Sequence, residues 1–320
     1  MINMQLEGLK ILVTGGAGFI GSHVSEELIK KGCKVTILDN LSGGRIENIQ
    51  NIKNVRFIKG DITNKDLIKD ALKDVDAIIH MAAAFANIKS IEDPIEDAEI
   101  NINGTLNLLT QSLNYDIKRF VYASSSAVYG DVNVFPLKEN LPTYPRTPYA
   151  VSKLAGENYC KVFNINYGLP TTSLRFFNVF GPKEYPGKYR GIVANFIFDL
   201  LSINSPKITG DGTETRDYTY ITDAIKPIIP AMLEKKAVSE VFNISTGVEV
   251  TTLELLKKIQ TILHSNIKPT FVSFRRYDIK RKVGDITKAK KILGYDPKFK
   301  LEDGLRLTVD WMKKNYIENR

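Results

Sequence analysis

The segment Leu12-Val-Thr-Gly-Gly-Ala-Gly-Phe-Ile-Gly21 joins an apolar run to glycines spaced Gly-x-x-Gly-x-x-Gly. The apolar run predicts a strand over residues 9–14, and a helical pattern over residues 19–31 follows the glycines. Because glycines lack β-carbons, they permit a tight turn and let the backbone approach a pyrophosphate, which the positive end of the helix attracts. An ordinary strand-to-helix turn is the alternative. The strand before and the helix after favour phosphate binding.

Further apolar runs alternate with helical patterns through the first half of the chain. Strands are predicted over residues 34–38, 55–58, 75–80, 118–123 and 171–176, and helices over residues 64–73, 90–113 and 149–166. This alternation is typical of an α/β fold with a doubly wound, Rossmann-like parallel sheet. The strands are almost entirely apolar, as burial on both faces of a sheet requires.

The alternation ends after residue 177, where a loop-like stretch over residues 181–191 begins. Residues 241–244 are short, apolar and bounded by turn signals, so we expect one more strand of the main sheet there. These features predict a dinucleotide-binding domain of residues 1–177 plus about 239–247. Residues 178–238 plus 248–320 would form a smaller, interleaved α/β substrate-binding lobe.

The composition is that of an ordinary globular protein, with 43% hydrophobic and 25% charged residues among 320. No apolar stretch approaches a membrane span, and the first residues lack signal-peptide features, so we expect a cytoplasmic protein. The net charge of +8 comes from lysines spread along the chain, which argues against nucleic-acid and membrane partners and is compatible with an anionic substrate. Two cysteines and three histidines show no metal-ligand spacing, so no metal is expected.

Two acidic residues follow predicted strands. Asp39 precedes the turn Asn40-Leu-Ser-Gly-Gly44, where a carboxylate can accept both hydroxyls of an adenosine ribose. The same carboxylate would repel a 2′-phosphate, so we expect NAD rather than NADP. Asp61, followed by Ile62, stands where an acid could hold the adenine amine. A simple Asx turn and a helix cap are the alternatives at these two positions.

Tyr149-Ala-Val-Ser-Lys153 places a phenol and an ammonium four residues apart, on one face of a predicted helix. The ammonium, beside a nicotinamide cation, would lower the pKa of Tyr149 from about 10. Ser125 closes the fifth strand, where its hydroxyl could pass a proton between a substrate oxygen and the tyrosine. A serine-rich turn is the alternative there. The Tyr-x-x-x-Lys spacing arises easily by chance, so its position after the fifth strand is the stronger argument.

Together these segments resemble the extended short-chain dehydrogenase/reductase family, and within it the NAD-dependent sugar-nucleotide epimerases and dehydratases. The similarity is strongest to the enzymes that epimerise UDP-glucose at C4. It covers essentially the whole chain and runs in order through Thr14–Gly21, Asp39-Asn40, Asp61-Ile62, His80–Ala83, Asn101–Thr105, Ser124–Gly130, Tyr149–Lys153, Arg175–Pro182 and Arg216–Tyr220.

The resemblance implies roles for individual residues. Tyr149 would be the catalytic base, Lys153 its electrostatic partner and ribose ligand, and Ser125 the proton bridge. The implied cofactor-binding residues are Gly15, Gly18, Phe19, Ile20, Gly21, Asp39, Asn40, Ser42, Gly43, Asp61, Ile62, Ala82, Ala83, Tyr149, Lys153 and Phe177. The nucleotide sugar would contact Ser125, Ser126, Tyr149, Asn178, Arg216, Arg275 and Asp278. Arg216 could instead pair with Glu214, and Tyr277 replaces a family glycine just before Asp278.

The reaction is suggested by what the serine triplet lacks. Dehydratases of the family carry Thr-Asp-Glu where this chain has Ser125-Ser126-Ala127, so the acid and base of an elimination are missing. Decarboxylating relatives carry Glu where Ala127 stands. The resemblance therefore implies NAD-dependent C4 epimerisation of a nucleotide sugar of the UDP-glucose/UDP-galactose type, through a transient 4-keto sugar and hydride return. Another epimerase, 4,6-dehydratase or decarboxylase of the family is the alternative, and a non-enzymatic dinucleotide sensor or RNA-binding protein is a distant one.

The helices predicted over residues 90–113 and 149–166 carry more apolar positions than one sheet face needs. In the family such helices pair with their twins in a four-helix bundle, which implies a homodimer. Simple coverage of the sheet is the alternative. The apolar positions in question are Leu106, Leu109, Leu113, Leu154, Val162 and Phe163.

Overall fold

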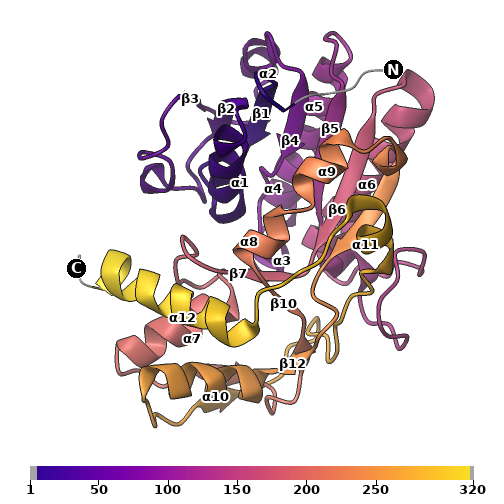
Figure 1. Ribbon diagram of the computed structural model, residues 1–320. Helices are drawn as coiled ribbons and strands as arrows, with labels where there is room; N and C mark the ends of the chain where they lie inside the picture. The colour runs from indigo at the N-terminus through magenta and orange to yellow at the C-terminus, as the bar shows by residue number, and fades with distance from the viewer. Residues whose placement is uncertain (1–5, 318–320) are drawn as a thin grey trace.

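The computed structural model describes residues 6–317, whose centre is a seven-stranded parallel sheet (Figure 1). The strand order is β11-β6-β5-β4-β1-β2-β3. The strands are β1 Lys10–Thr14, β2 Lys34–Asp39, β3 Val55–Lys59, β4 Ala77–His80, β5 Arg119–Ser125, β6 Thr171–Phe176 and β11 Glu240–Ile244. This confirms the predicted doubly wound fold, and the segment near residues 241–244 pairs with β6 at the edge of the sheet.

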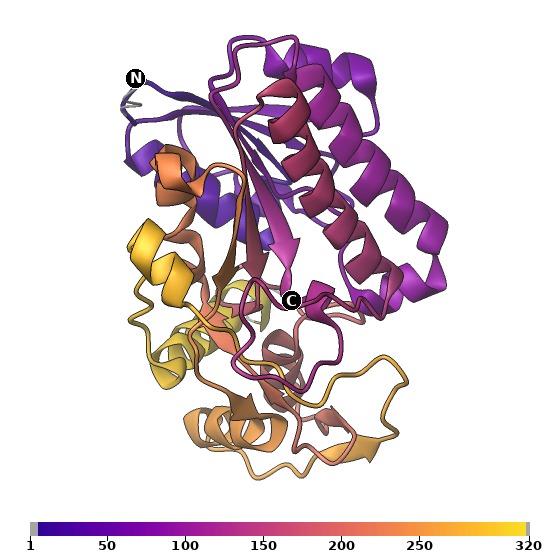
Figure 2. The ribbon, with the colours of Figure 1, turned by 90° about the vertical axis from the view of Figure 1, so that its right-hand side faces the viewer.

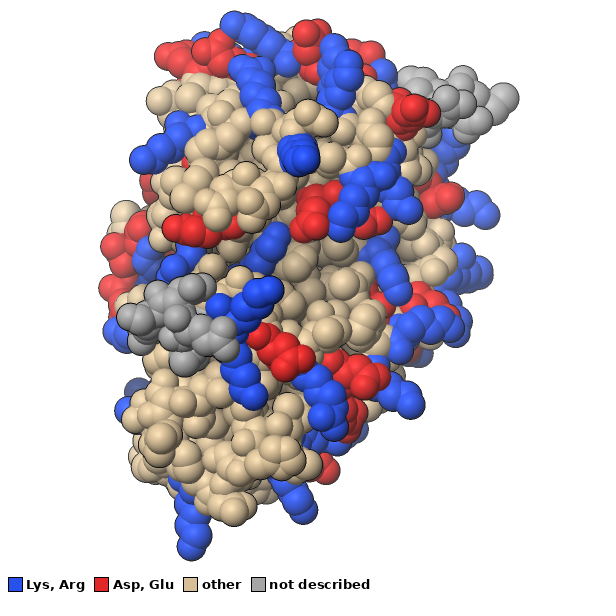
Figure 3. All heavy atoms as spheres, turned by 60° about the vertical axis from the view of Figure 1, so that its left-hand side comes forward, with Lys and Arg blue, Asp and Glu red and all other residues tan. Residues whose placement is uncertain are grey.

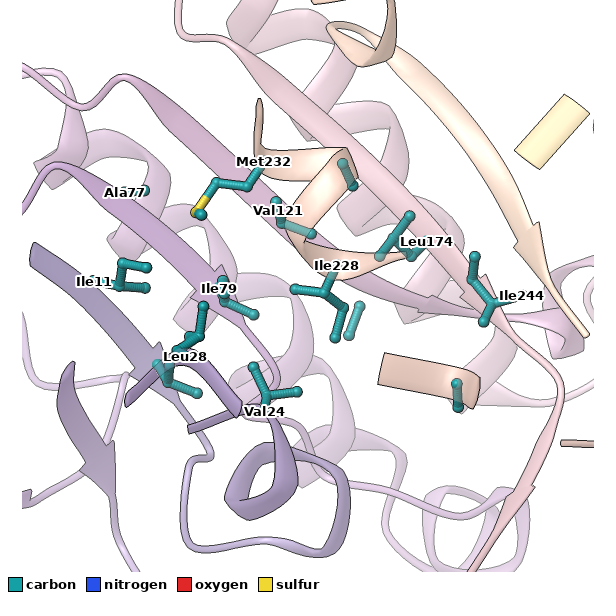
Figure 4. Close-up of a cluster of buried hydrophobic side chains, with 14 of the residues drawn as sticks. Ile11, Val24, Leu28, Ala77, Ile79, Val121, Leu174, Ile228, Met232 and Ile244 are labelled. Atoms are coloured by element: carbon teal, nitrogen blue, oxygen red, sulfur yellow. The ribbon is translucent and has the colours of Figure 1, made fainter. Parts of the chain in front are cut away.

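Helices cover both faces of the sheet, and the alternation of side chains along each strand explains why. Ile11 and Val13 of β1 point into a core shared with α1 and α9, and Figure 4 shows Ile11 among the residues of this core. Leu12 points into a second core, shared with α2, α5 and α6. The covering helices are α1 Phe19–Lys30, α8 Ile221–Ile225 and α9 Ile228–Leu233 on one face, and α2 Lys65–Leu72, α5 Thr105–Ser112 and α6 Pro148–Tyr167 on the other.

Local signals fix where the main helices begin and end. The Asn64 side chain accepts hydrogen bonds from the first backbone N–H groups of α2. Helix α6 begins at Pro148 under a Thr147 cap and ends at Gly168, which adopts the left-handed conformation. The predicted single helix over residues 90–113 is wrong in its first part. Residues 87–92 form a separate short helix, α3 (Asn87–Glu92), because Pro94 forces the preceding residue, Asp93, out of the helical region.

Beyond Asp93 the chain is helical up to residue 112, but not uniformly. It passes from α4 Pro94–Ala98 through one π-helical turn, η2 Glu99–Gly104, into α5. Gly104 lies against Ile62, where an added β-carbon would come within 2.6 Å of the isoleucine side chain. A glycine at this point therefore lets the helix approach the loop after β3 closely.

A second core lies away from the sheet, in the lower part of Figures 1 and 2. It joins β7 Asn178–Phe180 and β10 Tyr218–Tyr220 to α7 Ile192–Leu201, α10 Thr252–Leu263 and α12 Leu301–Met312. The smaller elements around it are β8 Lys207–Thr209, β9 Thr215–Arg216, β12 Val250–Thr251, β13 Thr270–Val272 and α11 Thr287–Leu293. The predicted division into a dinucleotide-binding domain and a substrate-binding lobe stays a prediction.

The surface shows no segregation of charge on the face drawn in Figure 3, where Lys and Arg side chains alternate with Asp and Glu. Across residues 6–317, no helix combines the length and apolar character that a membrane span requires.

Candidate active site

The order of the sheet determines where a ligand can enter. Chain connections run outward in opposite directions from β1 and β4, so the carboxyl ends of these neighbouring strands open a crevice. A cavity of about 380 Å³ lies there. All sixteen residues predicted to bind the cofactor line it: Gly15, Gly18, Phe19, Ile20, Gly21, Asp39, Asn40, Ser42, Gly43, Asp61, Ile62, Ala82, Ala83, Tyr149, Lys153 and Phe177.

The glycine loop fits a pyrophosphate. Gly15 has φ +68°, and a β-carbon there would lie 2.6 Å from the backbone nitrogen of Ala82. At Gly21 an added β-carbon would lie 2.2 Å from the carbonyl oxygen of Gly15. Helix α1 follows directly, and no side chain caps its N-terminus at Gly18. The first N–H groups of α1 and its positive dipole end are therefore available to a phosphate in the cavity.

The two predicted acidic residues hold the turns at the end of the cavity where the adenosine is expected. Asp39 accepts hydrogen bonds from the backbone nitrogens of Ala17 (2.9 Å) and Leu41 (2.8 Å). Burial raises the pKa of Asp39, although these hydrogen bonds oppose the change. A carboxylate has about four acceptor positions, so capacity remains for ribose hydroxyls.

Asp61 is tied to the same region by the Asn40 amide, which donates to it at 2.6 Å. Asp61 also accepts from the backbone and hydroxyl of Thr63, both at 2.8 Å. Burial would raise the pKa of Asp61, but hydrogen bonds from Thr63 and Asn40 prevail and lower it. The helix-cap alternative at Asp61 is wrong, because Asn64 caps α2, and the side chain of Asp61 instead forms an Asx turn with Thr63. The Asx-turn alternative at Asp39 is correct as a description of local structure, and both residues line the cavity.

Tyr149, Ser125 and Lys153 meet at the opposite end of the cavity, where β5 ends and α6 begins. The Ser125 hydroxyl lies close enough to the Tyr149 phenol to act on its pKa. Lys153 donates to the carbonyl oxygen of Ala123 at 2.9 Å, and its Nζ lies 5.9 Å from the centre of the Tyr149 ring. The helix therefore presents both side chains to the strand that carries the serine.

The sequence predicts a low pKa for Tyr149 beside Lys153 and a nicotinamide cation. Within the protein itself, Lys153 alone does not lower this pKa. Burial raises the pKa of Tyr149 to about 12, and the nearby Ser125 hydroxyl only partly opposes this. Burial also lowers the pKa of Lys153 to about 8, while the nearby Asp97 acts in the other direction. A lower pKa for Tyr149 therefore requires additional positive charge close to the phenol.

A buried hydrogen-bond network around Asn101 lies next to Lys153 and includes Asp97, whose charge raises the pKa of the lysine. The Asn101 amide donates to Asp97 (2.9 Å), to the Ser152 hydroxyl (3.1 Å) and to the carbonyl oxygen of Ala84 (2.9 Å). Asp97 and Asn101 are almost fully buried. The network links α4, the π-helical turn and α6 to the loop that follows β4, and it places an acid near the lysine.

The residues predicted to bind substrate are not all brought together. Within residues 6–317, the lining of the cavity includes Ser125, Tyr149 and Asn178 but not Ser126, Arg216, Arg275 or Asp278. Ser126 is buried in a short 3-10 helix, η3 Ser126–Tyr129. Arg275 forms an ion pair with Asp278 at 3.0 Å, and both line a separate cavity with Arg146 and Arg281.

Arg216 donates to the carbonyl oxygen of Thr215 and, within the described chain, forms no ion pair with Glu214. Burial lowers the pKa of Arg216, and the charge of Arg275 adds to this change. The charges of three acidic side chains oppose it: Tyr218, Asp278 and Glu214. The neighbouring Lys282 is buried as well, and its pKa is lowered to about 7 by burial and by the charge of Arg216. Three cations thus lie near one another, an arrangement that an anion would stabilise.

Further residues that the sequence did not reveal also line this cavity, among them Phe85, Glu184, Tyr189 and Arg190. Glu184 accepts from the Gly191 backbone, and its other carboxylate oxygen has no partner among the described residues. Burial raises the pKa of Glu184 to about 7. Glu184, Tyr189 and Arg190 lie in the predicted loop of residues 181–191. The sequence signal that could have pointed to them is that this loop follows the carboxyl end of a strand, where ligands bind.

Other chemistry finds little support in this region. Among residues 6–317, no three His, Cys, Asp or Glu side chains gather closely enough to hold a metal ion. Cys33 and Cys160 are buried free thiols.

Comparison with known proteins agrees with this geometry. The model of the NAD dependent epimerase/dehydratase family matches residues 11–245. The UDP-glucose 4-epimerase of Mycolicibacterium smegmatis is 35% identical over 95% of this chain and 99% of its own length. A crystal structure of UDP-glucose 4-epimerase from Thermotoga maritima with UDP-glucose is 38% identical, with a TM-score of 0.92 over 96% of this chain and 99% of that one.

A third relative differs in its sugar. The UDP-N-acetylglucosamine 4-epimerase of Methanobrevibacter ruminantium, solved with UDP-N-acetylmuramic acid, is 36% identical, with a TM-score of 0.92 over 98% of this chain and 100% of that one. With the family model covering most of the chain and these relatives covering nearly all of it, the chain belongs to the NAD dependent epimerase/dehydratase family of extended short-chain dehydrogenases/reductases, and NAD is its cofactor.

Proposed function

We propose that the protein interconverts the C4 epimers of a UDP-hexose, of the UDP-glucose/UDP-galactose type. The observation that carries this proposal is that Tyr149, Ser125 and Lys153 come together in the lining of the NAD cavity. Both hydroxyls face a space that also contains Asn178. A sugar hydroxyl placed there would lie within reach of a general base and of a proton bridge.

In this mechanism Tyr149 accepts the proton of the C4 hydroxyl, either directly or through Ser125. NAD, held by the residues that line the cavity, would supply the hydride chemistry at C4, accepting the hydride in its oxidised form and returning it in its reduced form. Lys153 stabilises the tyrosinate through its charge, and Tyr149 returns the proton after the 4-keto sugar has turned over. Asn178 and Arg216 would hold the diphosphate, since arginine binds phosphate oxygens bidentately. No role is proposed for Arg275 and Asp278, which pair with each other and line a separate cavity.

Elimination and decarboxylation need further groups at the sugar. The carboxylates that line the cavity are Asp39, Asp61 and Glu184, and each one accepts hydrogen bonds from backbone in a turn or at a helix start. Ser126 and Ala127, at the positions where dehydratases carry acidic residues, are buried in η3. One similar structure is that of a UDP-N-acetylglucosamine 4-epimerase, which supports C4 epimerisation as the reaction. Its sugar differs from the one proposed here.

A panel of nucleotide sugars, incubated with the purified protein without added NAD and followed by NMR, tests the proposal. We expect UDP-galactose to form from UDP-glucose until the two reach equilibrium, because the hydride returns to the sugar and NAD is regenerated in each cycle. Exclusive turnover of UDP-N-acetylglucosamine or of a UDP-uronate would overturn the proposed sugar. Net accumulation of a 4-keto or decarboxylated product would overturn the proposed reaction.

We also propose a homodimer formed through α4 and α6, which pack against each other on the outer face of the sheet (Figure 2). Two of the residues predicted to form the interface, Leu109 and Phe163, instead lie in the core of the subunit. Other apolar residues of these helices are exposed: Ile95 is 78% exposed, Ile165 65% and Val162 43%. An exposed apolar stripe on neighbouring helices is typical of an interaction surface.

Sedimentation velocity at micromolar concentration should therefore show a dimer for the native protein and a monomer for Ile165→Glu. Ile203, which follows α7 and is 83% exposed, provides the control, since Ile203→Glu adds the same charge away from the two helices. A native protein that sediments as a monomer would contradict the proposal. A cytoplasmic location stays a prediction.

A further inference from the structure

The segment of residues 182–191, which we call the strap, forms one wall of the NAD cavity. It leaves β7 at Pro182 and reaches the N-terminal end of α7, and Glu184, Tyr189, Arg190 and Gly191 line the cavity from it. Asn195 of α7 holds the strap against that helix. Its amide oxygen accepts a hydrogen bond from the Gly187 nitrogen at 2.8 Å, and its amide nitrogen donates to the Gly187 carbonyl oxygen at 3.1 Å.

The strap is attached on both sides of the cavity. At its start, the His23 ring lies 2.9 Å from the carbonyl oxygen of Pro182. Lys183 donates to the Asn48 carbonyl at 3.1 Å. Near its end, Lys188 and Tyr189 both bind the Glu92 carboxylate of α3, at 2.7 and 2.5 Å. These contacts tie the β1–α1 side of the site to the loop and helix that follow β4.

Arg190 connects the strap to the opposite wall of the cavity through Gly43 and Phe85. Its guanidinium donates to the carbonyl oxygen of Gly43 at 2.9 Å and lies 4.4 Å from the centre of the Phe85 ring. Phe85 also lies against Gly43, where an added β-carbon would come within 3.0 Å of the ring. We call Arg190, Phe85 and Gly43 the clasp. It joins the turn after Asp39, the loop after β4 and the strap.

The protein compensates the charge of Arg190 only in part, through the nearby Glu184 carboxylate. Among residues 6–317, no carboxylate forms an ion pair with it, and its polar contact is to a neutral carbonyl. Burial lowers the pKa of Arg190, and the charge of Arg45 acts in the same direction, while Glu184 opposes them. A half-buried cation on a cavity wall is stabilised when an anion binds beside it.

We propose that the clasp closes over bound NAD, with Arg190 facing the pyrophosphate opposite the open N-terminus of α1. Arg190, Phe19 and Gly43 line the same cavity, and a guanidinium fork matches phosphate oxygens. The Phe85 ring holds the guanidinium plane in place through a cation–π contact. Arg190 and Phe85 thus slow the release of the cofactor, independently of which sugar the enzyme takes.

The rate of NAD release tests the clasp directly. The NAD-loaded protein is freed of excess cofactor, and released NAD is converted by alcohol dehydrogenase and ethanol to NADH, which is followed by fluorescence. We expect Arg190→Ala and Phe85→Ala to release NAD at least tenfold faster than the native protein. Arg190→Lys keeps the charge without the planar fork, so its rate of NAD release should lie between those of the native protein and Arg190→Ala. Arg306→Gln, an exposed charge removal on α12, is the matched control and should not change the rate.

The position of Arg190 over the pyrophosphate is tested by calorimetry on the cofactor-free protein. Arg190→Ala should weaken the binding of ADP-ribose at least tenfold and leave the binding of adenosine nearly unchanged. Equal losses for the two ligands, or native release rates in both alanine variants, would overturn the proposal. Should Arg190→Ala or Phe85→Ala fail to fold, Arg190→Lys and Phe85→Leu carry the same test, because each preserves the bulk of the side chain.

Discussion

Replacing Tyr149 by phenylalanine is expected to lower kcat by about 10²–10⁴-fold, the range that one positioned general acid–base group contributes. The substitution removes only the hydroxyl, which lies near Ser125. The ring stays in place at the start of α6. The proton of the sugar hydroxyl would then have no acceptor at the end of the Ser125 bridge, so the oxidation step would stall.

The measurement separates this loss from unfolding and from loss of cofactor. NMR turnover with UDP-glucose gives kcat, while thermal unfolding and the NAD content of the purified protein should match the native values. Tyr159→Phe, ten residues further along the same helix, is the control and should keep native turnover, because Tyr159 packs against the core of the sheet. Native activity in Tyr149→Phe would remove the basis of the proposed mechanism.

Much of this site could be predicted because it depends on local sequence. Apolar runs bounded by turn signals predict the strands to within two residues at each end. Ligand-binding motifs follow the carboxyl ends of these strands, and parallel strands bring all such ends to one edge. The glycine loop, Asp39, Asp61 and the Tyr149 pair therefore line one cavity, as the sequence predicts.

The remainder depends on tertiary structure, which a local pattern does not contain. Loop residues have no periodicity, so the sequence does not tell which side chains of the strap face inward. The pKa of Tyr149 depends on burial, which outweighs the effects of its neighbours. Leu109 and Phe163 have the apolar character of interface residues, yet the sheet takes them into its own core.

The second large effect concerns stability. Glu157 lies four residues beyond Lys153 on α6, on the same face of the helix, and forms a bidentate ion pair with Arg175 of β6, with both N–O distances 2.8 Å. It also accepts a hydrogen bond from the Ser124 hydroxyl of β5. Both side chains of the ion pair are about 95% buried. Glu157 therefore joins the helix that carries Tyr149 to β6 through Arg175, and to β5, the strand that carries Ser125, through Ser124.

Glu157→Leu should destabilise the protein by about 3–5 kcal/mol, because it leaves the Arg175 charge buried without its partner. The double variant Glu157→Leu/Arg175→Met removes both charges and should recover most of this loss, since well-packed apolar groups often replace a buried pair at little cost. Urea unfolding followed by circular dichroism measures the free energies, and the native protein, the two single variants and the double variant complete a double-mutant cycle.

Glu249 and Arg281 provide a matched control, because they form the same bidentate contact at the surface, with Nε–Oε and Nη–Oε distances down to 2.6 Å. Glu249→Leu should change stability little, since water solvates the arginine that remains. A double variant at positions 157 and 175 that is no more stable than Glu157→Leu would show that packing around these side chains, rather than the unpaired charge, causes the loss. Recovery would instead show that the unpaired charge of Arg175 causes the loss, and that apolar packing can hold α6 against β6 in place of the ion pair.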